Sequence, residues 1–137
     1  MNWQKVFYEC EPSKELSVNH LYFTTMKNGK AIRVMTKEGK QHKRAMAFLV
    51  HRKYKDLPDQ MLEVKISIHG SWHFKNGNPR RMDVSNFIKL VEDALSEGLN
   101  TDDRWVWKVT AEKVEDSHHG IEIAWRDYLQ TDPGPEA

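Results

Sequence analysis

The sequence predicts an α+β fold: one domain with a mixed β-sheet and two main helices packed on it. Three observations lead to this prediction. Apolar and polar side chains alternate in several short segments, which is typical of strands with one buried face. Two longer segments carry apolar residues three and four positions apart, as amphipathic helices do. The 137 residues suffice for one hydrophobic core, so we expect a domain over residues 1–126 and a flexible C-terminal tail over residues 127–137.

The first half of the chain predicts a strand, a hairpin and a helix. Val6–Cys10 is β-prone, and a Glu-Pro-Ser sequence ends it. Asn28-Gly29 is a strong turn signal, so Leu21–Met26 and Ala31–Met35 are expected to pair as a hairpin. Lys37–Tyr54 then predicts a basic helix. Its inward-facing residues should be Ala45, Met46, Leu49 and Val50.

The second half predicts a strand, a helix and a second hairpin. Leu62–Ile68 alternates strictly between apolar and polar residues, which indicates a strand with one buried face. Val84–Glu97 is the clearest helix, with one apolar arc and one polar arc, and Gly98 is expected to stop it. Trp105–Ala111 and Ile121–Trp125 alternate again and predict two strands joined by a turn.

Composition excludes some classes of protein. No apolar run reaches the ~18 residues of a membrane span, and the N-terminus has no signal-peptide core. A single cysteine, Cys10, excludes an internal disulfide and fits a reducing compartment. We therefore expect a cytoplasmic protein without membrane contact.

Charge is distributed unevenly although the net charge is only +1. Lys27–Lys55 contains ten Lys or Arg residues and one acid, whereas acids outnumber bases twelve to four from Glu92 onward. Two interpretations remain open. The segments are either two solvated faces of opposite sign, or a basic surface for phosphates beside an acidic pocket for cations.

The predicted helix carries polar residues in line along its exposed face. Asn86, Lys89 and Asp93 stand at positions i, i+3 and i+7, so they share one stripe. Each has an ordinary explanation as a solvated helix residue. Asp83, just before the helix, is equally a candidate N-cap.

A second acidic cluster follows the helix, at Asp102-Asp103. By itself such a pair is the ordinary polar end of a loop. The next strand, however, can return beside the strand that leads to Asp83, which would bring both clusters to one edge of the sheet. Converging carboxylates repel each other unless a cation lies between them.

These residue types suit a metal-dependent phosphodiesterase. Carboxylate oxygens without His or Cys favour Mg²⁺, or alternatively Mn²⁺. Lys89 is placed to stabilise charge in the transition state. The residues expected to hold DNA phosphates are Lys75, Arg80 and Arg81 in a loop and Lys43 and Arg44 on the first helix.

The same residues resemble the RusA family of Holliday-junction resolvases. That family has a basic run, Asp-x-Asp-Asn, a Lys four residues after the second Asp, Asp-Ala-Leu, and Asp-Asp before a strand. The segment Leu16–Tyr22 also resembles the family's Pro-Ser-x-Asn-x-x-Tyr, in which Asn19 and Tyr22 either order the site or form a structured turn. The matching core residues here are Arg80-Arg81, Asp83-Val84-Ser85-Asn86, Lys89, Asp93-Ala94-Leu95 and Asp102-Asp103.

The resemblance implies a homodimer that makes paired nicks in branched DNA, specifically in four-way junctions, with Mg²⁺. It also implies that Asp83, Asp102 and Asp103 are metal ligands and that Asp83, Lys89 and Asp103 are catalytic. A phage or prophage origin would be usual for the family. Ser85 departs from the pattern, because it stands where the family has its second aspartate. The alternative is therefore a RusA-like DNA-binding protein that has lost nuclease activity.

The sequence allows more than one role for several aromatic and histidine side chains. Trp72 and Phe74 flank the loop before the basic pair, and either could stack on an exposed base, although Trp72 also fits the core. Trp105 and Trp107 are expected in the core or at a dimer interface. Four histidines are expected at strand ends and turns rather than as metal ligands, because no carboxylate stands at ligand spacing from them. These are His69, His73, His118 and His119.

Overall fold

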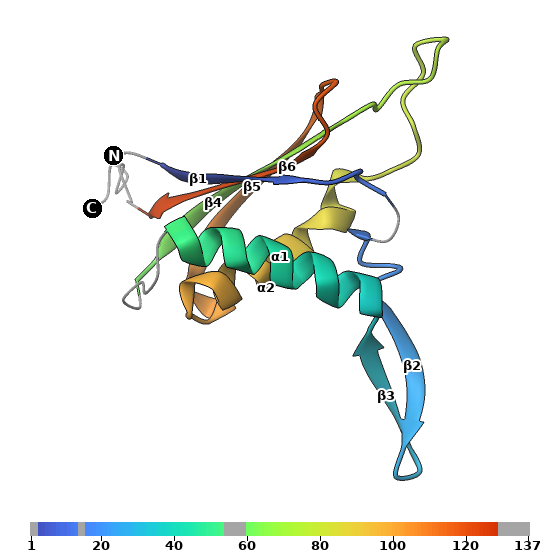
Figure 1. Ribbon diagram of the computed structural model, residues 1–137, viewed down its shortest axis with the longest axis vertical. Coiled ribbons are helices and arrows are strands. Elements are labelled where there is room, and N and C mark those ends of the chain that lie inside the picture. Colours follow the sequence, from blue (N-terminus) through green and yellow to red (C-terminus); the bar gives the residue numbers. More distant parts are fainter. Residues whose placement is uncertain (1–2, 14–15, 54–59, 129–137) are drawn as a thin grey trace, which may run out of the picture.

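The computed structural model describes residues 3–13, 16–53 and 60–128. Its strands form a four-stranded sheet in the order β1-β6-β4-β5 and a separate two-stranded sheet, β2-β3. Two α-helices lie on one face of the larger sheet (Figure 1). In chain order the elements are β1 (Gln4–Glu9), β2 (Tyr22–Lys27), β3 (Lys30–Met35), α1 (Lys37–Lys53), β4 (Leu62–Gly70), the 3₁₀ turn η2 (Val84–Phe87), α2 (Ile88–Leu99), η3 (Asp103–Trp105), β5 (Val106–Glu115) and β6 (Gly120–Asp127).

The α+β prediction with a mixed sheet is confirmed. Strand β4 pairs parallel with β5 and antiparallel with β6. Parallel neighbours need a long crossover connection, and the segment that contains η2 and α2 supplies it. The expected return of the chain beside β4 is therefore present. The predicted pairing of Trp105–Ala111 with Ile121–Trp125 as a hairpin is wrong, because β4 lies between β5 and β6 in the sheet.

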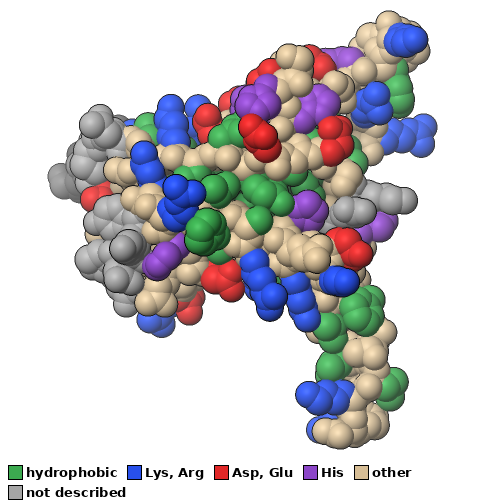
Figure 2. Space-filling view, viewed as in Figure 1, with side chains coloured by type: hydrophobic (Ala, Val, Ile, Leu, Met, Phe, Trp, Pro, Cys, Tyr) green, Lys and Arg blue, Asp and Glu red, His purple; other side chains and the backbone are tan. Residues whose placement is uncertain are grey.

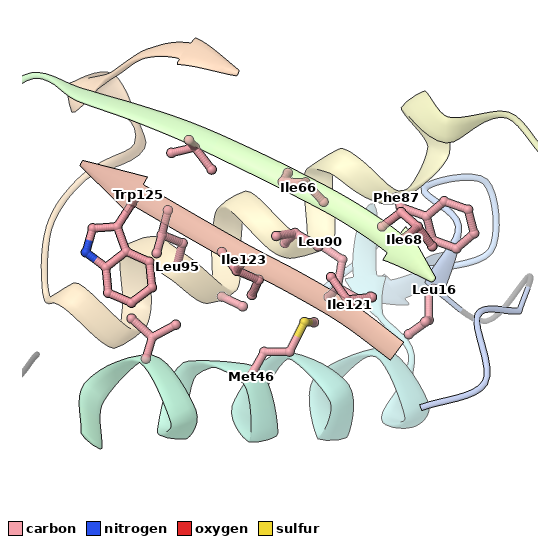
Figure 3. Close-up of a cluster of buried hydrophobic side chains, with 14 of the residues drawn as sticks. Leu16, Met46, Ile66, Ile68, Phe87, Leu90, Leu95, Ile121, Ile123 and Trp125 are labelled. Atoms are coloured by element: carbon pink, nitrogen blue, oxygen red, sulfur yellow. The ribbon is translucent and has the colours of Figure 1, made fainter. Parts of the chain in front are cut away.

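The hydrophobic core lies between the sheet and the two helices (Figure 3). The alternating residues of β4 and β6 point into it, as the period of two requires. From the helices, Met46, Leu90 and Leu95 meet them, and all three are fully buried. Helix α1 buries Ala47 rather than the expected Ala45, which is half-buried.

Gly98 has a different role from the one that the sequence suggested. It lies inside α2, and a Cβ there would come within 2.6 Å of the Ala47 carbonyl oxygen and 2.7 Å of Val50 on α1. The glycine therefore permits close packing of α1 against α2. The helix ends at Leu99, and the cap residue Asn100 after it adopts a left-handed conformation with φ 54°.

Trp107 is 61% exposed, so it does not belong to the core. The register between β4 and β5 shifts near their start: Leu62 pairs with Val106, but Glu63 pairs with Lys108. The extra residue forms a bulge, and a bulge breaks the alternation on which a burial prediction depends. Trp107 stacks instead on Tyr128.

The structure describes only part of the expected C-terminal tail and of the expected first helix. Asp127 ends β6, and Tyr128 donates its backbone N–H to the Met61 carbonyl oxygen at 2.9 Å. The rest of the expected tail, residues 129–137, and the end of the expected first helix at Tyr54 lie outside the described residues. Among the described helices, none has the length and apolar character that crossing a membrane requires.

Candidate active site

The segment that enters α2 is held by backbone and side-chain contacts. Lys113 of β5 donates to the Met82 carbonyl oxygen at 2.9 Å, and its ammonium lies 5.2 Å from the centre of the Trp72 ring. One turn later, the Asn86 carbonyl oxygen accepts the Val18 N–H at 2.8 Å. These contacts position Asp83 directly before η2. Asp83 is exposed, and its side chain makes no capping hydrogen bond, so its carboxylate is available to a ligand.

Lys89 and Asp103 lie together at the centre of the candidate site. The Lys89 ammonium is 4.0 Å from a carboxylate oxygen of Asp103 and 3.1 Å from one of Asp93, a residue one turn along α2. Ser96 donates its hydroxyl to the other oxygen of Asp103. Since Lys89, Asp93 and Ser96 share one helical stripe, α2 presents Asp103 with both a cation and a hydroxyl donor.

The electrostatics of this cluster keep Lys89 charged. The hydrogen bond from Lys89 to Asp93 is the largest cause that raises the lysine pKa. Burial opposes it, and the negative charges of Asp93, Tyr22 in its ionised form, and Asp103 raise the pKa further. A fixed positive charge at this position suits stabilisation of a phosphate that gains negative charge.

Glu92 adds a third carboxylate to the surroundings of Asp103. Burial raises the pKa of its carboxyl group, and the nearby charge of Asp103 raises it further. Lys89 is the cation that opposes this effect. The cluster therefore concentrates negative charge beyond what its lysine neutralises, which is the electrostatic condition that favours cation binding.

Asp102 is engaged locally. It directly precedes η3, and its side chain accepts the backbone N–H of Arg104 at 2.9 Å, as a helix cap does. In the part of the chain that the structure describes, no group of three or more His, Cys, Asp or Glu side chains is arranged to hold a metal ion by itself. Among the described residues, the side-chain contacts of Asp103 are with Lys89 and Ser96 and do not include Asp83. Mg²⁺ commonly binds one or two carboxylates together with water and substrate phosphates, so a site of this kind needs no complete protein cage.

The loop before η2 exposes the expected phosphate-binding residues. Lys75, Arg80 and Arg81 are all exposed, and the loop stands out from the upper right of the molecule with Lys and Arg side chains near it (Figures 1 and 2). Arg80 and Arg81 line a pocket of about 410 Å³ together with Phe74. The Arg80 guanidinium lies 5.1 Å from the centre of the Phe74 ring, which holds both at the pocket wall. Trp72 is buried in the core, whereas Phe74 is half exposed.

The two expected basic residues of α1 lie at a different place. Arg44 lines a separate pocket of about 420 Å³ with Lys37, Lys40 and Phe23. Lys43, its neighbour, is partly buried. The basic residues thus form two groups, one in the loop before η2 and one where α1 meets β2 and β3.

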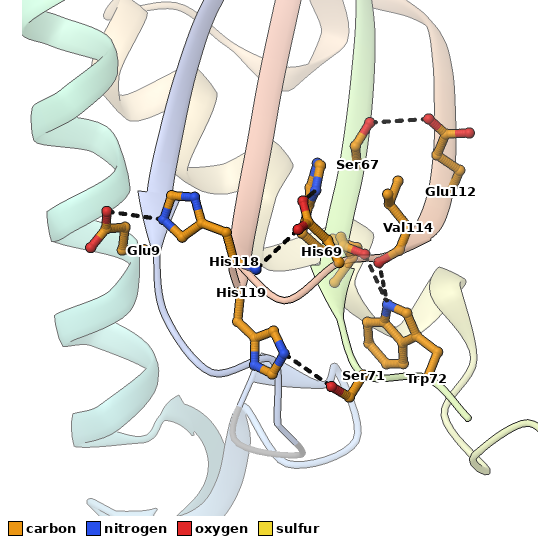
Figure 4. Close-up of polar contacts among 11 residues, drawn as sticks. Glu9, Ser67, His69, Ser71, Trp72, Glu112, Val114, His118 and His119 are labelled. Atoms are coloured by element: carbon orange, nitrogen blue, oxygen red, sulfur yellow. Dashed lines mark hydrogen bonds and ion pairs between the residues drawn. The ribbon is translucent and has the colours of Figure 1, made fainter. Parts of the chain in front are cut away.

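Each of the four histidines contacts a carboxylate, and Figure 4 shows three of them, His69, His118 and His119, at one end of the sheet. The sequence shows no carboxylate at metal-ligand spacing from them, and spacing does not reveal these contacts, because the partners come from distant parts of the chain. His69 contacts Asp116 at 2.9 Å, His73 contacts Glu115 at 2.6 Å, His118 contacts Glu9 at 3.1 Å and His119 contacts Glu11 at 2.6 Å. None of these described pairs belongs to a metal-binding group.

The sequence did not single out Glu92 and Ser96 as site residues. Their helical spacing from Lys89, three and seven residues, was the available signal. The proximity of Tyr22 to Lys89 had no signal in spacing, because it depends on how the loop after β1 packs against η2.

Comparison with protein families gives a match to one family model that covers most of the chain. The family model described as endodeoxyribonuclease RusA matches residues 17–126. This range contains Asp83, Lys89 and Asp103 as well as all of α1 and α2. A search of curated proteins gives no match to this chain.

Proposed function

Because the chain belongs to the RusA family of endodeoxyribonucleases, whose members act on Holliday junctions, we propose that it hydrolyses phosphodiester bonds at four-way DNA junctions with Mg²⁺ as cofactor. The observation that carries the proposal is the contact between Lys89 and Asp103. It joins a helix lysine to an acidic residue fourteen positions away, beyond the end of the helix. A solvated helix lysine and a polar loop end would not require this arrangement.

The donor chemistry fits a hard divalent cation. Asp83 and Asp103 are the residues expected to hold Mg²⁺ or Mn²⁺, with Asp102 beside them, because all offer carboxylate oxygens. Such an ion supplies a bound water of lowered pKa and neutralises charge on the phosphate.

The protein's own residues have separable roles in this scheme. Lys89 remains protonated and is placed to stabilise the negative charge that develops on the attacked phosphate. Ser96 and Lys89 together orient Asp103. Arg80, Arg81 and Lys75 hold neighbouring phosphates, which positions the strand but reads no sequence.

Single-turnover cleavage of a labelled four-way junction tests these roles. Lys89→Ala and Asp103→Asn should each lower the rate about 10²- to 10³-fold, the usual effect of removing one group that stabilises a transition state. Asp83→Asn should do the same. Junction affinity should change little, since none of the three is assigned to phosphate binding.

The matched control is Lys65→Ala. It removes an exposed lysine of β4 whose side chain lies on the face of the sheet opposite the core. It should cut at the parental rate. If Lys89→Ala also cuts at the parental rate with saturating junction, Lys89 is a surface lysine and has no part in the chemistry.

The other candidate function is junction binding without cleavage, and it is motivated by the residue at the family's second aspartate position. Ser85 occupies it, and a serine hydroxyl cannot supply the missing charge. A RusA-like protein that binds junctions without cutting them would bind the labelled junction tightly and leave it intact in both Mg²⁺ and Mn²⁺. Product formation that depends on metal excludes this alternative.

A homodimer is the expected assembly. Strand β5 forms one edge of the four-stranded sheet. It carries the exposed Trp107, whose ring stacks on that of the half-buried Tyr128 with ring centres 6.2 Å apart. Exposed aromatic residues are common at interfaces between subunits. Sedimentation velocity should give a dimer for the parental chain and a shift toward monomer for Trp107→Arg.

A further inference from the structure

Strands β2 and β3 form an arm that projects from the rest of the molecule (Figure 1). Asn28 and Gly29 make its turn, with φ values of 52° and 75°, as a two-residue hairpin requires. At its base, the Thr36 N–H donates to the carbonyl oxygen of the fully buried Leu21 at 2.7 Å. An isolated two-stranded hairpin is only marginally stable, so an arm of this kind gains from a binding partner.

The arm is basic and carries exposed apolar side chains. Between Leu16 and Lys37 the sequence has no acidic residue, while Lys27, Lys30 and Arg33 lie on the arm itself. Figure 2 shows the projecting arm with basic and apolar side chains. Met26 is 65% exposed and Phe23 is 50% exposed. A surface of cations without acids complements a polyanion.

One face of the arm leads to the candidate active site. In the antiparallel register Tyr22 pairs with Met35 and Thr24 with Arg33, so Tyr22 and Arg33 are diagonal neighbours on one face. The Arg33 guanidinium indeed lies 5.2 Å from the centre of the Tyr22 ring. The loop before β2 also contacts the segment that enters α2, because the Val18 N–H donates to the Asn86 carbonyl oxygen at 2.8 Å. These contacts join the base of the arm to the segment that leads to Lys89.

We propose that the β2-β3 arm binds one duplex of the junction beside the cleaved phosphate, with Arg33 on the DNA backbone and the tip in a groove. A two-stranded β-ribbon fits the major groove of B-DNA, where apolar side chains such as Met26 can contact thymine methyl groups. The proposal rests on the proposed function, because it assumes a junction as substrate.

DNA suits the arm better than a second copy of the chain does. A protein partner would need carboxylates opposite Lys27, Lys30 and Arg33, since the arm offers no acid in return. The acidic cluster around Asp103 is the surface that the substrate itself must approach. Phosphates offer the complementary charge without competing for the active site.

Salt-dependent binding gives the first test. Affinity for a labelled four-way junction is measured in EDTA between 50 and 200 mM salt. Arg33→Ala should weaken binding and reduce the slope of log affinity against log salt by about 1, and Lys27→Ala with Lys30→Ala by about 2, as loss of one phosphate contact each predicts. Arg33→Lys should restore most of the slope, because it keeps the charge. Lys65→Ala is the control and should leave the slope unchanged.

Tethered cleavage gives the second test and does not depend on affinity. Burial raises the pKa of the Cys10 thiol to about 12, so an introduced cysteine on the exposed arm reacts selectively. Met26→Cys carrying iron-EDTA should cut one duplex within a few base pairs of the branch point. Lys65→Cys with the same label is the control and should give no localised cuts.

Each outcome separates the arm from the wider proposal. If the parental chain does not bind junctions, the proposed function fails. If it binds and cuts junctions while the arm variants keep the full salt slope and labelled Met26→Cys gives no local cuts, the arm inference alone is overturned. Sedimentation velocity tests whether a second copy of the chain binds the arm instead. A folded Arg33→Ala variant that becomes monomeric, with an unchanged salt slope of junction binding, would assign the arm to a second copy and overturn the inference.

Discussion

Ser85 is the residue at which the candidate site departs from the family pattern, because it stands where the family has its second aspartate. It lies exposed in η2, two positions after Asp83. Ser85→Asp should lower the Mg²⁺ concentration needed for half-maximal cleavage, because an added anionic oxygen near the ion favours its binding. A carboxylate near a helix start is also compatible with the helix dipole.

A magnesium titration of the cleavage rate measures this effect. Ser85→Thr keeps a neutral hydroxyl and should leave the midpoint where it is. An unchanged midpoint in Ser85→Asp would mean that another carboxylate already fills this role. Glu92 would then be the first residue to replace, because its carboxyl group lies close to Asp103.

Two carboxyl groups at the histidine end of the sheet link stability to pH. The hydrogen bond from His73, together with one from the Trp72 N–H, lowers the pKa of Glu115 below 4.5. The His118 N–H, followed by His69, lowers the pKa of Asp116 below 3.8. A lowered folded-state pKa contributes stability above the ordinary pKa, and that contribution is lost as the pH falls through the folded value.

Thermal unfolding from pH 6 down to pH 3 checks this link. The parental chain should lose stability across the lower part of that range. Asp116→Asn should be less stable at pH 6 and show a shallower decline, because one titrating group is gone. A decline as steep as in the parental chain would show that Asp116 makes no such contribution.

At the scale of elements, the contact between α1 and α2 depends on Gly98. An added Cβ would approach the Ala47 carbonyl oxygen and Val50 more closely than side chains tolerate. Gly98→Ala should therefore lower the free energy of unfolding by about 1–3 kcal/mol, the usual cost of overpacking, although alanine favours a helix more than glycine does.

Chemical denaturation of Gly98→Ala measures this change. The exposed Gly29 cannot serve as its control, because φ there is positive. Ser71→Ala changes an exposed residue outside the helices and should cost far less. A Gly98→Ala variant as stable as the parental chain would mean that the two helices can separate without loss.

The elements also show what the sequence could predict. Period and turn chemistry are local, so the arm, both helices and the strands of the sheet were predicted close to their observed positions. The role of Gly98 and the pairing of β5 with β6 were predicted wrongly. Both depend on non-local facts: the approach of α1 and the position of β4 between the two strands. Of the two places predicted for Trp107, its exposure excludes the core.

In the candidate site, too, local sequence patterns predicted some contacts and could not predict those that depend on non-local packing. Lys89 and Asp103 were suggested by a helical stripe and a returning strand, and the structure brings them into contact. The closeness of Tyr22 to Lys89 arises from packing of the loop before β2 against η2, which includes the hydrogen bond from Val18 to Asn86. Helical spacing says nothing about such packing.

At the scale of the whole molecule, two basic projections extend from the same side in Figure 1: the loop after β4 and the β2-β3 arm. The acidic cluster of α2 and η3 belongs to the crossover between β4 and β5. The uneven charge of the sequence thus corresponds to basic projections and an acidic site, an arrangement suited to gripping branched DNA while a cation binds at the site of cleavage.

The central claim is tested most directly by one comparison of substrates. The purified parental chain is incubated with a labelled four-way junction and with a linear duplex of the same sequence, each with Mg²⁺ and with EDTA. We predict nicks in the junction with Mg²⁺, little or no cutting of the linear duplex, and none in EDTA. Equal cutting of both substrates, or an intact junction that is nevertheless bound, would contradict the account.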